Sequence, residues 1–300
     1  MSFGVDAPLL AIDWGTTSLR GAWMSSEGEV LEERALAAGV QGVAPGQFRA
    51  AFDAAFGDWW ARPGARGLIS GMAGSRQGWI EAPYCACPNH WADLARAVTW
   101  IEPSRLAIVP GLSCEHDGVP DVMRGEEVQV LGAARRLELV DQTLVLPGTH
   151  SKWVRLRAAR VEDFVTVMTG EVYALLRQRS ILARTLPSEE DSWHAGAFDE
   201  GVACAWRASG LLQSAFSVRT LSLTERLPLP HRLSYLSGLV IGEELRCRQA
   251  AEAGSVVLVG APALTQRYAR AFAGVGVQAR VLGETATWQG LYALAREVWP

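Results

Sequence analysis

The sequence predicts an α/β protein of two domains. Apolar runs of strand length alternate with stretches whose apolar residues recur at helical spacing, and one strand–turn–strand pattern occurs twice, once in each half of the chain. The 300 residues are 49% hydrophobic, which is enough to fill two cores of ordinary size. We therefore expect an N-terminal domain over residues 1–140 and a C-terminal domain over residues 141–300.

The first copy of the pattern lies at residues 9–24 (LLAIDWGTTSLRGAWM). An apolar run ends at Asp13, a turn of small residues follows at 15–18, and a second strand begins at Leu19. Glycine allows the backbone to approach a ligand, and successive N–H groups beside hydroxyls suit phosphate oxygens. Asp13 could hold a hydrated Mg²⁺ next to them. The alternative is an ordinary β-hairpin whose polar side chains only satisfy turn hydrogen bonds.

The second copy lies at residues 144–156 (LVLPGTHSKWVRL). Its turn, Gly-Thr-His-Ser at 148–151, matches Gly-Thr-Thr-Ser at 15–18 in three of four places, and a basic residue and a tryptophan follow each turn. Two copies in separate halves favour a duplicated domain that grips a polyphosphate from both sides.

Charge and hydropathy exclude some partners. The net charge is −4 and no run of lysines or arginines occurs, so the chain has no electrostatic footprint for nucleic acid. No segment reaches the roughly 18 to 20 apolar residues of a membrane span, and no signal-type N-terminus is visible. We expect a cytoplasmic protein without a membrane partner. Its oligomeric state stays open, with a homodimer as one outcome.

Five scattered cysteines do not form a disulfide framework. An odd number over a long chain favours reduced thiols. A zinc site could be assembled from Cys85, Cys87 and His90 with Cys114 and His116, but the C-x-C spacing is not that of the usual zinc knuckle. The preferred interpretation is that these are buried or half-buried loop residues.

The remaining elements follow from apolar periodicity and Gly/Pro breaks. In the first half we expect strands at 29–36 and 106–109, a strand at 67–74 that runs into a glycine-rich loop from residue 71 to 79, and helices at 47–60 and 91–100, with a helix that starts near 126. In the second half we expect strands at 154–156, 160–164, 166–168, 256–259 and 278–282, helices at 170–178, 181–184, 198–213, 235–253, 265–272 and 287–299, and a surface connection at 188–197.

The loop after the strand at 67–74 carries candidate acceptor-binding residues. Ser75, Arg76 and Gln77 lie on a glycine-rich, flexible backbone beyond the strand end. An arginine there can clamp a carboxylate while serine and glutamine bond hydroxyls. The alternative is a solvated surface loop.

Two adjacent carboxylates follow Arg124 and Gly125 at a strand-to-helix junction. A carboxylate at such a place can accept the proton of a substrate hydroxyl that attacks a terminal phosphate. We prefer Glu126 as this base and hold Glu127 in reserve. The alternative is that both are ordinary first-turn residues that interact with the helix dipole.

A small-residue turn near the end of the chain is a candidate adenosine site. The strand at 256–259 runs into Gly260 and Ala261, where an adenine or ribose could lie flat on the backbone. The alternative is an ordinary β–α turn that binds no ligand.

Five stretches together resemble the 2-dehydro-3-deoxygalactonokinase family of the actin-like ATPase and sugar kinase superfamily. They are residues 11–20 (AIDWGTTSLR), 71–79 (GMAGSRQGW), 123–127 (MRGEE), 146–153 (LPGTHSKW) and 168–171 (MTGE). The phosphate turns alone would indicate only the superfamily, whereas the second and fourth stretches are specific to the family. The resemblance covers nearly the whole chain.

This resemblance implies two ribonuclease-H-like α/β domains about a central cleft, and phosphorylation of the 6-hydroxyl of 2-dehydro-3-deoxygalactonate by ATP and Mg²⁺ in bacterial galactonate catabolism. It also implies roles for individual residues. Asp13 would hold the metal, and the adenosine would meet Gly260 and Ala261. The residues that would bind the phosphates are Gly15, Thr16, Thr17, Gly148, Thr149, Ser151 and Lys152, and those that would bind the sugar acid are Trp14, Ser75, Arg76, Gln77 and Arg124. Many kinases of the superfamily use an aspartate base, whereas this junction offers only glutamates.

Three rival functions stay open. The phosphate turns do not select the acceptor, so a kinase for another small sugar or sugar acid is the nearest rival. Exopolyphosphatases of the superfamily carry a similar Gly-Glu-Glu stretch, which leaves phosphate hydrolysis as a second. An ATP-binding sensor is the third, although no DNA-binding segment accompanies the turns.

Overall fold

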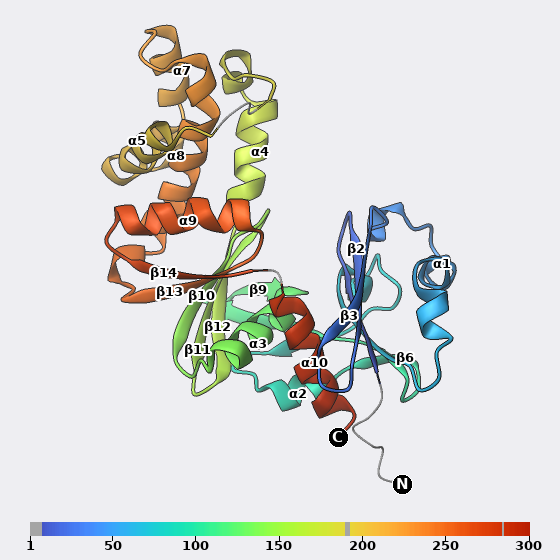
Figure 1. The fold of residues 1–300 in the computed structure, drawn as a ribbon. Coiled ribbons are helices and arrows are strands. Elements are labelled where there is room, and N and C mark those ends of the chain that lie inside the picture. Colours follow the sequence, from blue (N-terminus) through green and yellow to red (C-terminus); the bar gives the residue numbers. More distant parts are fainter. Residues whose placement is uncertain (1–7, 190–192, 284) are drawn as a thin grey trace. The chain divides into compact units, whose positions relative to one another are not determined.

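The computed structural model describes residues 8–189, 193–283 and 285–300, and it is an α/β protein as predicted. Its contacts divide the chain into two units (Figure 1). The first contains the described residues up to Gln142 together with 154–165 and 285–300, and the second contains 143–153 and 166–283. The proposed boundary between residues 140 and 141 stays a prediction.

The sheet of the first unit has the order β3-β2-β1-β4-β7-β6. Its strands are β1 (Leu9–Trp14), β2 (Leu19–Met24), β3 (Val30–Leu36), β4 (Arg66–Gly71), β6 (Thr99–Glu102) and β7 (Leu106–Ile108). The first three form the predicted antiparallel meander, and β4 joins β1 in parallel with Trp14 opposite Gly71. The carboxyl ends of β1 and β4 therefore lie at the same edge of the sheet.

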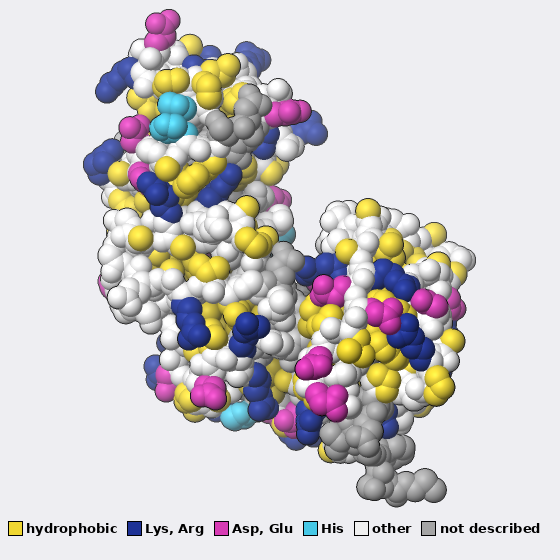
Figure 2. Space-filling model, viewed as in Figure 1, with side chains coloured by type: hydrophobic (Ala, Val, Ile, Leu, Met, Phe, Trp, Pro, Cys, Tyr) yellow, Lys and Arg dark blue, Asp and Glu magenta, His cyan; other side chains and the backbone are white. Residues whose placement is uncertain are grey.

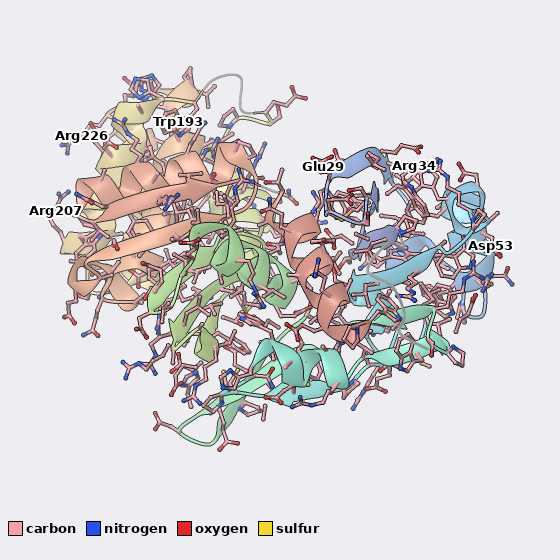
Figure 3. All side chains as sticks on the ribbon, turned by 60° about the horizontal axis from the view of Figure 1, so that its bottom comes forward. Glu29, Arg34, Asp53, Trp193, Arg207 and Arg226 are labelled. Carbon is pink, nitrogen blue, oxygen red and sulfur yellow. The ribbon has the colours of Figure 1, made fainter. Side chains whose placement is uncertain are left out.

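Helix α1 (Phe48–Trp60) supplies an aromatic core, as its periodicity predicts. Phe52 and Phe56 are fully buried in one cluster with Trp14 of β1. Arg34 of β3 lies 4.1 Å from the Trp59 ring centroid and pairs with Asp58 on the helix, which ties α1 to this edge of the sheet (Figure 3).

The rest of the first unit departs in part from the prediction. Helix α2 (Trp91–Arg96) ends earlier than the predicted 91–100, because residues 99–102 form β6 and pair with β7. A small sheet of β5 (Tyr84–Ala86), β8 (Gly111–His116) and β9 (Val119–Met123) was not predicted. Its strands are short and half exposed, so they lack the apolar alternation that identifies longer strands.

Helices α3 (Glu126–Leu137) and α10 (Ala286–Val298) cross with their backbones in contact. A Cβ on Gly132 would lie 1.8 Å from the Ala286 carbonyl oxygen, and one on Gly290 would lie 1.8 Å from that of Val128. Only glycine fits at both positions. The C-terminal helix is therefore part of the core of the first unit.

A five-stranded sheet has the order β12-β11-β10-β13-β14. The strands are β10 (Gln142–Leu146), β11 (Ser151–Arg157), β12 (Arg160–Val167), β13 (Ser255–Val259) and β14 (Gln278–Leu282). The prediction of separate strands at 160–164 and 166–168 was wrong, since β12 is continuous. Helix α9 (Pro262–Gly274) packs on β13 and β14 of this sheet (Figure 1).

The other helices of the second unit are α4 (Thr169–Arg179), α5 (Ala195–Arg207), α6 (Leu211–Ser214), α7 (Ser217–Leu223) and α8 (Arg232–Cys247). The predicted helix 198–213 is interrupted because Ala208 is extended, and the predicted helix 235–253 ends at Cys247. The predicted connection 188–197 overlaps the start of α5, and its residues 190–192 lie outside the described residues. A Cβ on Gly238 would lie 2.0 Å from the Phe198 carbonyl oxygen, so α8 packs tightly on α5.

Single-turn 3₁₀ helices complete the chain. They are η1 (Val40–Gly42), η2 (Met72–Gly74), η3 (Ile181–Thr185), η4 (Leu229–His231) and η5 (Ala250–Glu252).

Candidate active site

Three segments of the first unit meet at the carboxyl edge of β1 and β4. The Asp13 Oδ1 atom lies 3.4 Å from the point that a Cβ on Gly71 would occupy. Gly125 has a φ of +106°, and its own Cβ position lies 3.2 Å from the Gly71 Cα. Glycines at these two places therefore allow the start of α3 to approach the end of β1.

Asp13 is the candidate metal ligand at this edge. Its Oδ2 accepts hydrogen bonds from Arg20 Nη2 at 2.7 Å and Nε at 3.3 Å, and its side chain is 18% exposed. Its Oδ1 faces Gly71 instead. A partly exposed carboxylate oxygen of this kind fits a magnesium ion that keeps most of its waters.

The first candidate phosphate turn, at residues 15–18, is exposed at its tip, and its backbone is hydrogen-bonded to other parts of the chain. The Gly15 N–H donates to the Ser18 carbonyl at 2.8 Å, and the Gln41 N–H donates to the Thr16 carbonyl at 3.1 Å. Thr16 and Thr17 are exposed. Trp14, before the turn, is fully buried and donates its indole N–H to the Ala38 carbonyl at 3.0 Å, so the structure gives it a core position.

The loop after β4 is tightly bonded rather than flexible. Trp79 N–H donates to the Ala73 carbonyl at 2.8 Å, and Ala82 N–H donates to the Gly74 carbonyl at 2.9 Å. Gln77 is exposed. Arg76 is 85% exposed and pairs with Glu81 at 3.0 Å. The expectation of a flexible backbone was wrong, because these bonds close the loop on itself.

Ser75 differs from its neighbours in this loop. Its hydroxyl oxygen is buried and has no hydrogen-bond partner among the described residues. A buried hydroxyl without a partner loses the free energy of a hydrogen bond, and bound ligands often supply the missing bond.

Arg124 lies close to the same loop. Its Nη2 donates to the Ala82 carbonyl at 2.8 Å, its guanidinium lies 4.3 Å from the Tyr84 ring centroid, and its Nη1 is 2.9 Å from the Cβ position of Gly74. Nε and Nη1 are buried and lack an acceptor within the part of the chain that the structure describes. A buried guanidinium with unused N–H groups is suited to bind an anionic group.

Glu126 and Glu127 differ in exposure at the first turn of α3. Glu126 is half-buried and accepts a hydrogen bond from Arg124 N–H at 3.0 Å. Glu127 is fully buried, and its Oε2 accepts one from Gly125 N–H at 2.7 Å. Its Oε1 has no partner among the residues described. Burial, and then the nearby Glu126, raise the pKa of Glu127 to about 8.

This shift predicts that stability depends on pH through Glu127. Between pH 4.5 and about 8 the folded protein keeps a proton that the unfolded chain releases, so the free energy of unfolding falls as the pH rises. The contribution of this group is at most about 1.4 kcal/mol per pH unit. Glu127→Gln should flatten the profile measured by urea denaturation at pH 5, 6, 7 and 8. Equal slopes in the variant and the wild type would contradict this assignment of the proton.

The second phosphate turn is held by the start of α4. Glu171 N–H donates to the Thr149 carbonyl at 3.0 Å, and the Glu171 carboxylate meets His150 Nε2 at 2.5 Å. A Cβ on Gly170 would lie 2.5 Å from the Gly148 carbonyl oxygen, so helix and turn are in backbone contact. Thr149 and His150 are exposed, and no described atom outside its immediate neighbours lies within 4 Å of the Cβ position of Gly148. The turn is therefore open to a ligand.

The residues that follow this turn are buried. The Ser151 hydroxyl lies 3.0 Å from the Tyr268 hydroxyl, and Lys152 is 5% exposed. The candidate adenosine turn is close by, since Gly260 has a φ of +145° and its Cβ position lies 3.6 Å from the Pro147 carbonyl oxygen. Ala261 then caps α9. The second unit thus brings the phosphate turn and the adenosine turn together.

Each unit brings one part of the predicted site together. In the first unit these residues are Asp13, Ser75, Arg124, Glu126 and Glu127, and in the second they are Gly148, Thr149 and Gly260. Arg76 and Gln77 are directed to solvent. The sequence interpretation missed Glu244, which is 2% exposed beneath the second turn. A signal existed, because Glu244 lies four residues after Val240 and eight after Leu236 on the apolar face of α8.

Searches of the described residues for other kinds of site give two findings. No helix among them is both long and apolar enough to cross a bilayer, and no group of three or more His, Cys, Asp or Glu side chains is placed to hold a metal ion. The five cysteines are free thiols, four of them half-buried. On the face drawn in Figure 2, acidic, basic and hydrophobic side chains are interspersed.

Comparison with known proteins identifies the family. The family model of 2-keto-3-deoxy-galactonokinase matches residues 13–294. The Escherichia coli 2-dehydro-3-deoxygalactonokinase is 36% identical over 97% of this chain and 99% of its own. The crystal structure of a Sinorhizobium meliloti protein assigned the same activity has a TM-score of 0.90 and 37% identity, with 97% of this chain and 99% of that one covered.

A more distant structure supports the fold alone. The activator of the 2-hydroxyisocaproyl-CoA dehydratase from Clostridium difficile, with bound ADPNP, has a TM-score of 0.52 at 12% identity and covers 97% of this chain and 95% of that one. The fold is that of the actin-like ATPase superfamily, as the resemblance implied. The family model matches nearly the whole chain, and a curated relative is 36% identical over 97% of it. The chain therefore belongs to the 2-keto-3-deoxy-galactonokinase family.

Proposed function

We propose that this protein is an ATP-dependent kinase that phosphorylates the 6-hydroxyl of 2-dehydro-3-deoxygalactonate and releases 2-dehydro-3-deoxy-6-phosphogalactonate and ADP. The observation that carries the proposal is the family match over residues 13–294, which includes all the segments that meet in the candidate site. We also propose that it acts in the cytoplasm as part of galactonate catabolism.

The acid group of the sugar is assigned to Arg124 and Ser75. Two buried N–H groups of Arg124 and the buried Ser75 hydroxyl have no hydrogen-bond partner within the described chain, and a carboxylate can accept a charge-assisted bond from one of the two N–H groups. The resemblance assigned Arg76 to this role, with Gln77 and Trp14 as further contacts. Because Arg76 is 85% exposed and already paired with Glu81, it is the weaker candidate in this structure.

Glu126 is assigned as the base that takes the proton of the attacking hydroxyl. It is the half-buried member of the glutamate pair, whereas Glu127 exposes no surface through which to meet a substrate. Glu127 bonds the Gly125 N–H and so holds the backbone on which Glu126 lies. In this arrangement Glu127 is a positioning residue rather than a catalytic one.

The nucleotide is assigned to the two turns and the adenosine loop. Gly15, Thr16 and Thr17 would bind phosphate oxygens, and so would the exposed turn at Gly148 and Thr149. Ser151 and Lys152 would support the second turn, and Gly260 with Ala261 would meet the adenosine. Mg²⁺ held near Asp13 would neutralise charge on the phosphates when bound.

A coupled assay of ADP formation tests the proposal. With ATP and Mg²⁺, we expect turnover of 2-dehydro-3-deoxygalactonate at least about tenfold above that of galactonate or of neutral sugars, since the family is named for this keto acid and neutral sugars lack the acid group assigned to Arg124. Mass spectrometry and ³¹P NMR should place the new phosphate on C6. Phosphate release without any sugar would favour the hydrolase alternative, and nucleotide binding without turnover on any acceptor would favour a sensor.

A further inference from the structure

Glu244 of α8 is a buried carboxylate with hydrogen-bond donors from three other elements. Trp153 of β11 donates its indole N–H to Oε1 at 2.6 Å, Tyr268 of α9 donates its hydroxyl to Oε2 at 2.5 Å, and the Thr169 hydroxyl of α4 also donates to Oε2. The residue is 2% exposed. Such a site needs an explanation, because desolvating a carboxylate costs several kcal/mol that an apolar side chain of similar size would not.

The donors surround the second phosphate turn. Trp153 lies two residues after Ser151, whose hydroxyl is 3.0 Å from that of Tyr268. Thr169 directly precedes Gly170, which is in backbone contact with Gly148. Each segment that borders the turn is therefore tied to the same carboxylate, while Thr149 and His150 above it are exposed.

We propose that Glu244 is a positioning residue for the nucleotide: it fixes the relative placement of the second phosphate turn, the start of α4 and the middle of α9, and so sets the shape of the phosphate-binding surface. This inference rests on the proposed use of ATP. Satisfied buried polar networks hold one arrangement of their members, whereas apolar packing tolerates several. A phosphate turn needs this, since a displacement of about 1 Å can reduce the rate about 100-fold.

Glu244→Gln is the sharpest test. A glutamine keeps the size but has only one accepting oxygen, so it cannot accept both the bond that Trp153 donates and the bonds that Thr169 and Tyr268 donate. The matched control is Glu243→Gln, at the adjacent position, where the native carboxylate pairs with Arg246 at 2.7 Å on the outer side of the helix. Both variants remove one negative charge from the same helix.

The measurements are the Kd for ADP by calorimetry and the KM values for ATP and for the sugar acid. Glu244→Gln should raise the ADP Kd and the ATP KM about tenfold or more and change the sugar-acid KM less than twofold, and Glu243→Gln should change none of them twofold. A variant that melts at a lower temperature but keeps wild-type ADP affinity would overturn the inference, because Glu244 would then only stabilise the fold.

Two milder variants keep the inference testable if Glu244→Gln does not fold. Thr169→Val and Tyr268→Phe each delete one donor, and each should raise the ADP Kd severalfold. Unchanged ADP affinity in both would overturn the inference. A failure of the proposed function would give a different result, which the wild-type protein itself would show. The wild type would then bind ADP without phosphorylating a sugar acid, or would not bind ADP at all.

Discussion

Glu126→Gln is expected to lower kcat about 100-fold or more and to leave the KM values for ATP and the sugar acid within about threefold of the wild type. The amide has nearly the shape of the carboxylate but cannot take the proton of the attacking hydroxyl. Its side-chain oxygen can still accept the bond that Arg124 N–H donates to Glu126, so the start of α3 should keep its geometry. Steady-state kinetics with coupled ADP detection give all three constants.

Glu138→Gln provides the control for this loss. Glu138 is an exposed residue at the opposite end of α3, and its replacement removes the same charge without touching the candidate site. Its kcat should stay within about twofold of the wild type. If Glu126→Gln keeps a near-normal kcat while Glu127→Gln loses activity, the base is Glu127 and the assignment based on exposure is wrong.

Arg124→Met is expected to lower kcat/KM for the sugar acid about 100-fold. A charge-assisted hydrogen bond from a buried guanidinium to a carboxylate is worth about 1.5 to 3 kcal/mol, and methionine keeps only the packing of the side chain against Tyr84. The effect should depend on the acid group. Turnover of the carboxamide of the same sugar, which is slow in the wild type, should fall less than about threefold, since it has no charge to lose.

Arg76→Met separates the two arginine assignments. Arg76 is 85% exposed and its ion pair with Glu81 is a surface pair, so its removal should cost less than about threefold in kcat/KM. A larger loss in Arg76→Met than in Arg124→Met, confined to the acid substrate, would return the acid-binding role to Arg76. Equal losses in kcat/KM for the acid and for its carboxamide would show that neither arginine binds the charged carboxylate.

Much of the fold was predictable because long elements carry periodic patterns. The meander of β1 to β3 and helix α1 have strong alternation or helical spacing, and both were predicted within a residue or two. Strand β5 was missed because it pairs with a strand distant in sequence, and the local hairpin of β8 and β9 was missed although an Asp-Gly turn joins its half-exposed strands. The extended residue at Ala208 interrupts a predicted helix through local backbone geometry that composition does not reveal.

The candidate site was predictable in its residue types but not in its contacts. The sequence places Asp13, Arg124 and the two glutamates at element ends, which is where ligands bind in α/β folds. It cannot distinguish Arg76 from Arg124, because burial depends on how the loop closes on Ala73 and Gly74. The place of Glu244 on the apolar face of α8 marks it as a buried acid, but the sequence does not show which donors it meets.

The contact between α3 and α10 has a consequence for biosynthesis. The first unit begins with the N-terminal strands, but its glycine crossing at Gly132 and Gly290 requires a helix that is translated only after the whole second unit. The residues of the second unit end at Gly283. This unit can therefore finish folding before the first unit has its last helix. Until residues 286–298 leave the ribosome, the nascent chain lacks the helix that covers the glycine face of α3, so this face stays open to solvent.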